Sequence, residues 1–130
     1  MKRFIFIISL FTITLALCIL ESVYILDSFT FLETKLNQTS IILANSKDNI
    51  STKENVEFLK TLHSDWSKKK HVLKILVWHT GLKDVEVGLS RLKSYTEENN
   101  YTEAYAELKN LLDFTAHYKQ DFKVSFENIF

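Results

Sequence analysis

The first apolar run of the chain, Phe4 to Leu20, constrains the fold more than any other feature. Its 17 residues contain no charge, no glycine and no proline. As a helix, the run would be about 26 Å long, close to the roughly 30 Å of a bilayer's hydrocarbon core. A helix that is apolar on all sides needs either lipid or a large protein core around it. We therefore predict that this run spans a membrane.

Four fates of this run are compatible with its residues. We favour an uncleaved signal anchor over residues 1–20. A cleaved signal peptide is the second option, although such peptides have a shorter apolar region of about 7 to 15 residues and a small-x-small cleavage site, which Glu21 to Ile25 lack. A lipoprotein signal ending at Cys18 is the third, but Leu17 stands where that motif needs a small residue. The fourth is a buried helix of a soluble protein.

Basic residues beside the run predict its orientation, because Lys and Arg next to a span stay in the cytoplasm. Lys2 and Arg3 precede the run directly, whereas no basic residue follows it before Lys35. We predict a single-pass protein of the cell membrane with a cytoplasmic N-terminus and an extracytoplasmic domain over residues 21–130. The lone cysteine, Cys18, lies in the span, so the outer part has neither a disulfide nor a zinc–cysteine site.

The composition of the outer part favours long helices. The chain has no proline and only two glycines, Gly81 and Gly88, and few turns can be built from that stock. Subtracting Lys2 and Arg3 from 16 basic residues leaves 14, against 16 acidic ones, so the outer part carries a formal charge of −2. Such a balance creates no strong electrostatic attraction for nucleic acid, and we expect no nucleic-acid partner.

We predict an all-α fold, in which an N-terminal transmembrane helix is continuous with an antiparallel up-down bundle of about four helices. The first helix runs from the span to about Asn45. The second extends from a capping box at Ser51 to a left-handed cap at Gly81. The third and fourth cover about 82–98 and 102–123, and short connections make neighbours antiparallel. The core positions at helical spacing are Ile25, Phe29, Leu32, Leu36, Thr39, Leu43, Val56, Leu59, Leu62, Trp66, Leu73, Leu76 or Val77, Leu82, Val85, Leu89, Leu92, Tyr95, Ala104, Tyr105, Leu108, Leu111, Thr115, Tyr118 and Phe122.

Helix lengths predict which parts of the bundle lie near the bilayer. The first outer helix rises about 37 Å from the span, and the second descends about 43 Å. The third and fourth helices repeat this excursion, so the C-terminal tail returns to the same level. Trp and Tyr side chains favour the membrane–water interface. The predicted membrane-proximal interaction site therefore comprises Tyr24, Trp78, His79, Glu86, Phe126, Ile129 and Phe130.

Several short motifs point to a known family. They are Trp66 among lysines, Trp78-His79, Val85-Glu86, Leu89-Ser90-Arg91-Leu92 and the Phe126–Phe130 end. With the span, they resemble the bacterial domain-of-unknown-function 4363 family, whose members look like short, single-pass helical proteins. The resemblance implies this architecture but no activity, so no catalytic residue is carried over. One span followed by up-down helices is also similar to the sensor domains of bacterial chemoreceptors, whose second span and signalling region are missing here.

The histidines do not predict a metal site. His63, His71 and His79 are eight residues apart, so they fan around a helix by about 80° at each step. Asp113 and His117 share a helix face, but metal sites in bundles use Glu-x-x-His motifs, and the sequence has none. It also lacks a glycine-rich phosphate loop and a nucleophile elbow. We expect no metal, no other cofactor and no enzymatic activity.

Two polar features near the predicted interface have two interpretations each. His79 with Asp84 or Glu86 either caps the turn between helices or forms a polar site that senses mild acidity. Lys68-Lys69-Lys70 with Lys74 forms either a solvated helix face or a weak contact with an acidic wall polymer or partner. These lysines interrupt the apolar stripe of the second helix. They lie about 8 to 18 Å from its membrane end, too far for firm lipid binding.

The leading functional hypothesis is a non-catalytic accessory or adaptor subunit. It would contact lipid through Phe4–Leu20 and bind another envelope or integral membrane protein, because an apolar tail near the membrane needs a cover. The first alternative is a small-ligand sensor with a pocket near Trp66 in the bundle core. The second is a structural coiled-coil component of an envelope complex, which self-associates through the Phe29–Leu43 seam.

Overall fold

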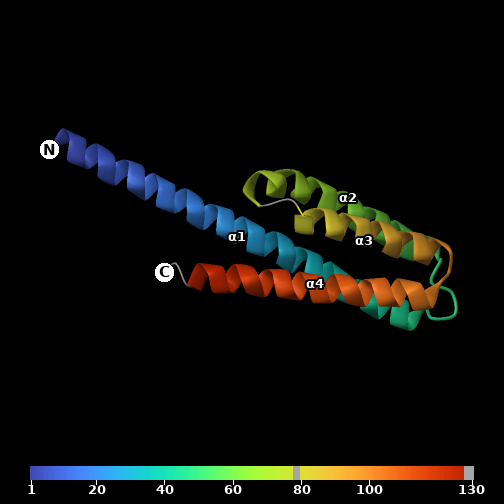
Figure 1. Ribbon diagram of the computed structural model, residues 1–130. Helices are drawn as coiled ribbons and strands as arrows, with labels where there is room; N and C mark the ends of the chain where they lie inside the picture. Colours follow the sequence, from blue (N-terminus) through green and yellow to red (C-terminus); the bar gives the residue numbers. More distant parts are fainter. Residues whose placement is uncertain (78–79, 128–130) are drawn as a thin grey trace.

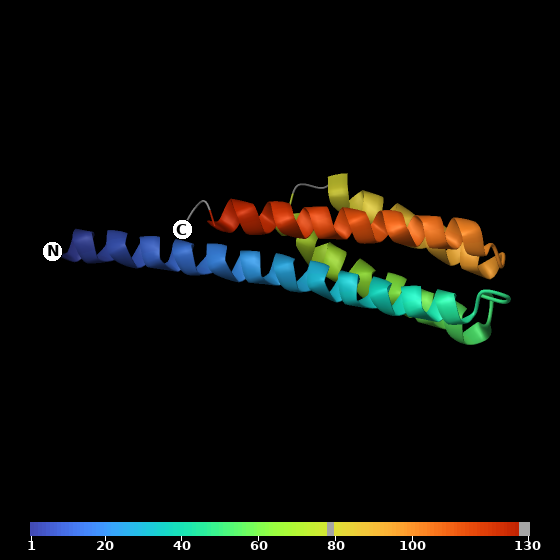
Figure 2. The same ribbon diagram turned by 90° about the horizontal axis from the view of Figure 1, so that it is seen from below.

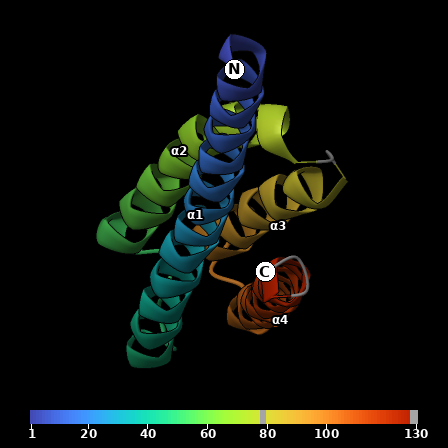
Figure 3. The same ribbon diagram turned by 90° about the vertical axis from the view of Figure 1, so that its left-hand side faces the viewer.

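Four helices make up the regular structure of the residues that the structure describes. The computed structural model describes residues 1–77 and 80–127, and the side chains of residues 1–77 and 81–123 among them. The helices are α1 (Lys2–Asn45), α2 (Lys53–Leu76), α3 (Thr80–Glu97) and α4 (Tyr101–Glu127). α1 and α3 each pack against both α2 and α4, which closes the four helices into a ring (Figures 1 and 3). Neighbours run antiparallel, and the predicted all-α up-down bundle is confirmed.

Only the second half of α1 belongs to the bundle. The helix is about 66 Å long and continuous, as predicted. Its residues 1–21 are exposed, and burial begins at Ile25. Figures 1 and 2 show this apolar half projecting past the other helices. We call the end from which it projects the proximal end, where α2 ends, α3 begins and α4 ends. The distal end holds the connections at 46–52 and 98–100.

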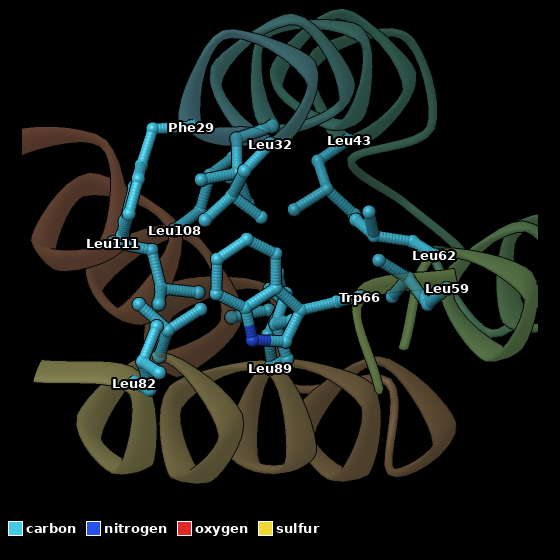
Figure 4. Packing of buried hydrophobic residues seen from close by; sticks show 14 of the residues in the cluster. Phe29, Leu32, Leu43, Leu59, Leu62, Trp66, Leu82, Leu89, Leu108 and Leu111 are labelled. Carbon is cyan, nitrogen blue, oxygen red and sulfur yellow. The ribbon is translucent and has the colours of Figure 1, made fainter. Parts of the chain in front are cut away.

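A leucine-rich core fills the space between the helices. Trp66 of α2 lies at its centre and is fully buried (Figure 4), with its ring edge-on to Phe29 of α1 at a centroid distance of 5.5 Å. Burying a Leu or Phe side chain contributes about 1.5–3 kcal/mol. Most predicted core positions are buried. Partly buried at the edge are Val56, Leu76, Val77, Tyr95, Tyr105, Tyr118 and Phe122.

The two connections at the distal end are bonded to each other. Asn99 adopts a left-handed conformation with φ 56°, and the Asn100 N–H donates to the Tyr95 carbonyl at 2.8 Å. This closes α3 in a Schellman motif. The Asn99 Oδ1 accepts from the Ile50 N–H at 2.8 Å, and the Asn55 Nδ2 donates to the Ile50 carbonyl at 3.1 Å. Both backbone polar groups of the buried Ile50 are therefore satisfied.

The N-terminal cap of α2 lies one residue later than predicted. The Thr52 Oγ1 accepts from the Asn55 N–H at 3.3 Å. The Ser51 hydroxyl instead donates to the Asn49 Oδ1 at 2.9 Å. Ser51 is thus used within the connecting turn, and the adjacent threonine takes over a role that both side chains perform well.

Gly81 lies inside α3, and the predicted left-handed cap at this residue is wrong. α2 already ends at Leu76, after which Val77 is extended at φ −130° and ψ 146°. Neither Gly81 nor Gly88 has a positive φ. A Cβ on Gly81 would lie 2.9 Å from Tyr118 Cε2. Glycine therefore serves the close approach of α3 to α4 at this position.

Replacing Gly88 by alanine is expected to destabilise the bundle. The new Cβ would lie 2.6 Å from Leu111 Cδ2 and 3.1 Å from its Cγ, and Leu111 is buried. Overpacking of this kind costs about 1–3 kcal/mol, which exceeds the roughly 1 kcal/mol gained in helix propensity. Urea unfolding should show a lower midpoint. Gly81→Ala places its Cβ against the partly exposed Tyr118 ring and should lose less stability. A Gly88→Ala variant that is more stable than wild type would contradict this packing of α3 on α4.

Candidate functional site

The structure describes the surroundings of two predicted site residues. Tyr24 lies on α1 and Glu86 on α3, both in the proximal half of the bundle. The predictions for Trp78, His79, Ile129 and Phe130 fall outside the described residues, and Phe126 is described only as part of α4.

Tyr24 meets a lysine from α2. The Lys69 ammonium lies 5.9 Å from the centroid of the Tyr24 ring and 5.0 Å from that of Phe31, within cation–π range. The same group lies 3.9 Å from the Asp27 carboxylate. Residues 24, 27 and 31 are neighbours on one face of a helix because of their spacing. Lys69 therefore bridges α1 and α2 through rings and a carboxylate together.

Glu86 forms an ion pair with Lys70 across the boundary between α2 and α3. The Lys70 side chain is only 13% exposed. Its burial lowers the pKa of the ammonium group, and the nearby positive charge of Lys74 lowers it further. Glu86, one of the two carboxylates that the sequence offers to His79, thus pairs with Lys70. A groove of about 470 Å³ opens here between the helices, lined by Lys70, Lys74, Lys83 and Glu86.

An aromatic row on α4 leads toward the proximal end. Phe114, Tyr118 and Phe122 follow one another at four-residue spacing, with ring centroids 5.7 and 5.3 Å apart. Tyr118 also stacks on Phe29 of α1 at 4.5 Å, and burial raises the pKa of its phenol. Phe126 stands four residues further along α4. Figures 1 and 2 show that α4 extends further toward the start of α1 than α2 and α3 do.

A known protein family matches the chain over the length of the bundle. A protein-family model described as Domain of unknown function (DUF4363) matches residues 22–129. The chain belongs to this family. The resemblance that the short motifs indicate is confirmed, and the matched region begins two residues after the apolar run ends at Leu20. No curated protein and no solved structure matches the chain significantly.

The two bridging lysines of this DUF4363 protein are missing from the site predicted by sequence. Lys69 and Lys70 are adjacent on α2, yet one ammonium group turns toward α1 and the other toward α3. One signal in the sequence does indicate this role, because both lysines interrupt the apolar stripe of α2 at core spacing. Only their carbon chains fit at the edge of the core, while their charged ends reach partners on the neighbouring helices.

His63 of the DUF4363 bundle is expected to make stability depend on pH. Burial lowers the pKa of its imidazole, and the charges of Lys93 and Lys70 lower it further. As the pH falls below about 6.5, the unfolded chain therefore binds more protons than the folded one, and stability decreases. Urea titrations at about pH 7.5 and 5.5 should show a smaller loss for His63→Gln than for wild type. Equal losses would contradict this account of His63.

Proposed function

We propose that this DUF4363 protein is a membrane-anchored, non-catalytic accessory subunit that binds another envelope protein at the proximal end of its bundle. The observation that carries the proposal is the bare apolar half of α1. It projects from the same end at which α2 ends, α3 begins and α4 ends. A binding surface there would lie beside the anchor, within reach of a second protein in the same membrane.

The exposed apolar surface of α1 supports the proposal that lipid surrounds this part of the helix. The helix reaches a mean hydropathy of 2.5 over an 18-residue window, none of which is buried in the bundle. Phe6 and Phe11 are 69% and 70% exposed. Soluble proteins rarely expose an apolar patch larger than a few hundred Å². With Lys2 and Arg3 held on the cytoplasmic side, the bundle would lie outside the cytoplasm.

Exposed apolar residues on α2 support a protein partner next to the anchor. Val72 and Ile75 are 42% and 82% exposed. They are three residues apart, so they share one face of the last two turns of α2. A partner standing beside α1 in the membrane would bury this face. Trp78, predicted for the same site, follows three residues after Ile75.

The core of the bundle gives less support to the two alternatives. A ligand near Trp66 would have to displace core side chains, since the ring is fully buried against Phe29 and leucines. Self-association through the α1 seam would require the bundle to open, because Leu36 and Leu43 are fully buried within their own chain. The adaptor function requires neither change.

Site-specific photo-cross-linking in living cells tests the proposal. A photoreactive residue at Ile75 should yield an adduct with one defined membrane or envelope protein. The same residue at Ile41 is the matched control, because this isoleucine is 63% exposed in the distal half of the bundle. It should yield no such adduct. Lipid adducts alone at Ile75, or the same protein captured from both positions, would contradict an adaptor surface at the proximal end.

A further inference from the structure

We propose that the groove between α2 and α3 binds the phosphate group of an anionic phospholipid. The lipid would come from the membrane that holds α1, so this inference rests on the anchor in the proposed function. The groove has a volume of about 470 Å³ and is lined by Lys70, Lys74, Lys83 and Glu86. Three lysines and one glutamate give it a formal charge of +2.

The positive charge in this groove is only partly neutralised. Glu86 is paired with Lys70. Among the described residues, neither Lys74 nor Lys83 is within ion-pair distance of a carboxylate. Lys74 is also close enough to Lys70 to disfavour its charged form. A phosphodiester placed between the lysines would supply the missing negative charge and accept hydrogen bonds from their ammonium groups.

The proximal part of the groove, at Lys74, would stand at the height of the headgroup zone of a bilayer. The Lys69 ammonium lies 5.9 Å from the Tyr24 ring, 3.9 Å from the Asp27 carboxylate and 5.0 Å from the Phe31 ring. These three residues lie about 6 to 16 Å along α1 beyond the end of the apolar run at Leu20. The polar zone on each side of the hydrocarbon core is about 5–8 Å thick. With α1 in a bilayer, Lys70 would therefore stand beyond this zone, whereas Lys74, one helical turn closer to the proximal end, would stand near its outer edge.

The observed end of α2 brings Lys74 closer to the proximal end than the sequence-based estimate of about 8 to 18 Å for the lysines of this helix. That estimate assumes a helix reaching Thr80, whereas α2 ends at Leu76. Lys74 is thus only two residues, or about 3 Å, from the proximal end of α2. Lys83 lies in the first turn of α3. With α1 in a bilayer, both ammonium groups would lie within a Debye length of the headgroups, about 8 Å at physiological salt.

Native mass spectrometry of the full chain, purified with equal amounts of phosphatidylglycerol and phosphatidylcholine, tests this site. Wild type should retain phosphatidylglycerol preferentially. The variant K74Q/K83Q leaves the Lys70–Glu86 pair intact and should reduce this preference by roughly fivefold for each lysine removed. The matched control K53Q/K60Q removes two exposed lysines from the distal half of the same helix and should keep the wild-type preference.

Four outcomes would overturn the lipid site. The preference could survive in K74Q/K83Q, or it could fall equally in K53Q/K60Q, which would indicate a net-charge effect. Glycerol phosphate could also bind the lipid-free protein as tightly as phosphatidylglycerol does, which would assign the groove to a soluble anion. Membrane integration of wild type is measured in parallel by alkaline extraction. If wild type does not integrate into the membrane, the proposed anchor is overturned. If it integrates but shows no headgroup preference, only the lipid site in the groove is overturned.

Discussion

Replacing Trp66 by alanine should lower the free energy of unfolding by about 3–5 kcal/mol, the range for large-to-small changes of a buried tryptophan. The ring is fully buried at the centre of the core, where side chains of all four helices meet (Figure 4). A bundle of this size is stable by only about 5–15 kcal/mol. Urea unfolding followed by circular dichroism should therefore find a much lower midpoint for Trp66→Ala than for wild type.

The Trp66→Phe variant is the informative control for this prediction. The Trp66 Nε1 has no hydrogen-bond acceptor among the described residues, and a buried, unsatisfied N–H costs about 1–3 kcal/mol. Phenylalanine removes this donor but keeps an aromatic ring against Phe29. We expect Trp66→Phe to remain within about 1 kcal/mol of wild type or to exceed it. A loss as large as that of Trp66→Ala would show that the indole N–H makes a stabilising hydrogen bond, which would contradict the unpaired Trp66 Nε1 of this core.

Two arginines in the apolar half of α1 should release the protein from the membrane without unfolding it. One arginine at the centre of a span costs about 2.5–3.5 kcal/mol. Leu10 and Ile13 are both 56% exposed and lie outside the bundle. The double variant L10R/I13R should move from the carbonate-resistant membrane fraction to the extractable fraction, and Ile13→Arg alone should do so in part.

The matched control for the arginine variants is Ile41→Arg. Ile41 is a similarly exposed isoleucine of the same helix, 63% exposed, but it belongs to the bundle half. Its substitution should leave the membrane fraction unchanged. Urea midpoints in detergent should agree among L10R/I13R, Ile41→Arg and wild type, because none of these side chains lies in the core. Retention of L10R/I13R in the membrane fraction, or loss of its bundle, would contradict a lipid-embedded α1.

Spacing along the chain predicts the core of this fold well, because helix geometry alone decides which residues share a face. Leu32, Leu36 and Leu43 are buried as their spacing predicts. The distal network escapes prediction, since the bond from the Ile50 N–H to Asn99 joins residues 49 positions apart. The role of Gly81 also escapes prediction. Whether this glycine ends a helix or lets two helices approach depends on the side chain that faces it, which is Tyr118 of α4.

For Tyr24 and Glu86, the two residues of the predicted site whose surroundings are described, the sequence predicts the half of the bundle in which they lie but not their pairings. Rise per residue places Tyr24 and Glu86 in the same half of the bundle, and the structure does the same. The pairing of Glu86 with Lys70 depends on how α2 and α3 are rotated about their axes, which no local pattern determines. The earlier end of α2 at Leu76 has no signal in the sequence, which contains no proline to mark a stop.

Labelling of the single native cysteine tests the lipid-embedded anchor most directly. Cys18 is a free thiol on the exposed surface of the apolar half of α1. In intact cells, a membrane-impermeant maleimide should leave Cys18 unmodified until detergent is added. The same reagent should modify Ser46→Cys, placed in the distal connection of a Cys18→Ser protein. Rapid modification of Cys18 in intact membranes, or recovery of a soluble chain that begins beyond residue 20, would contradict the account.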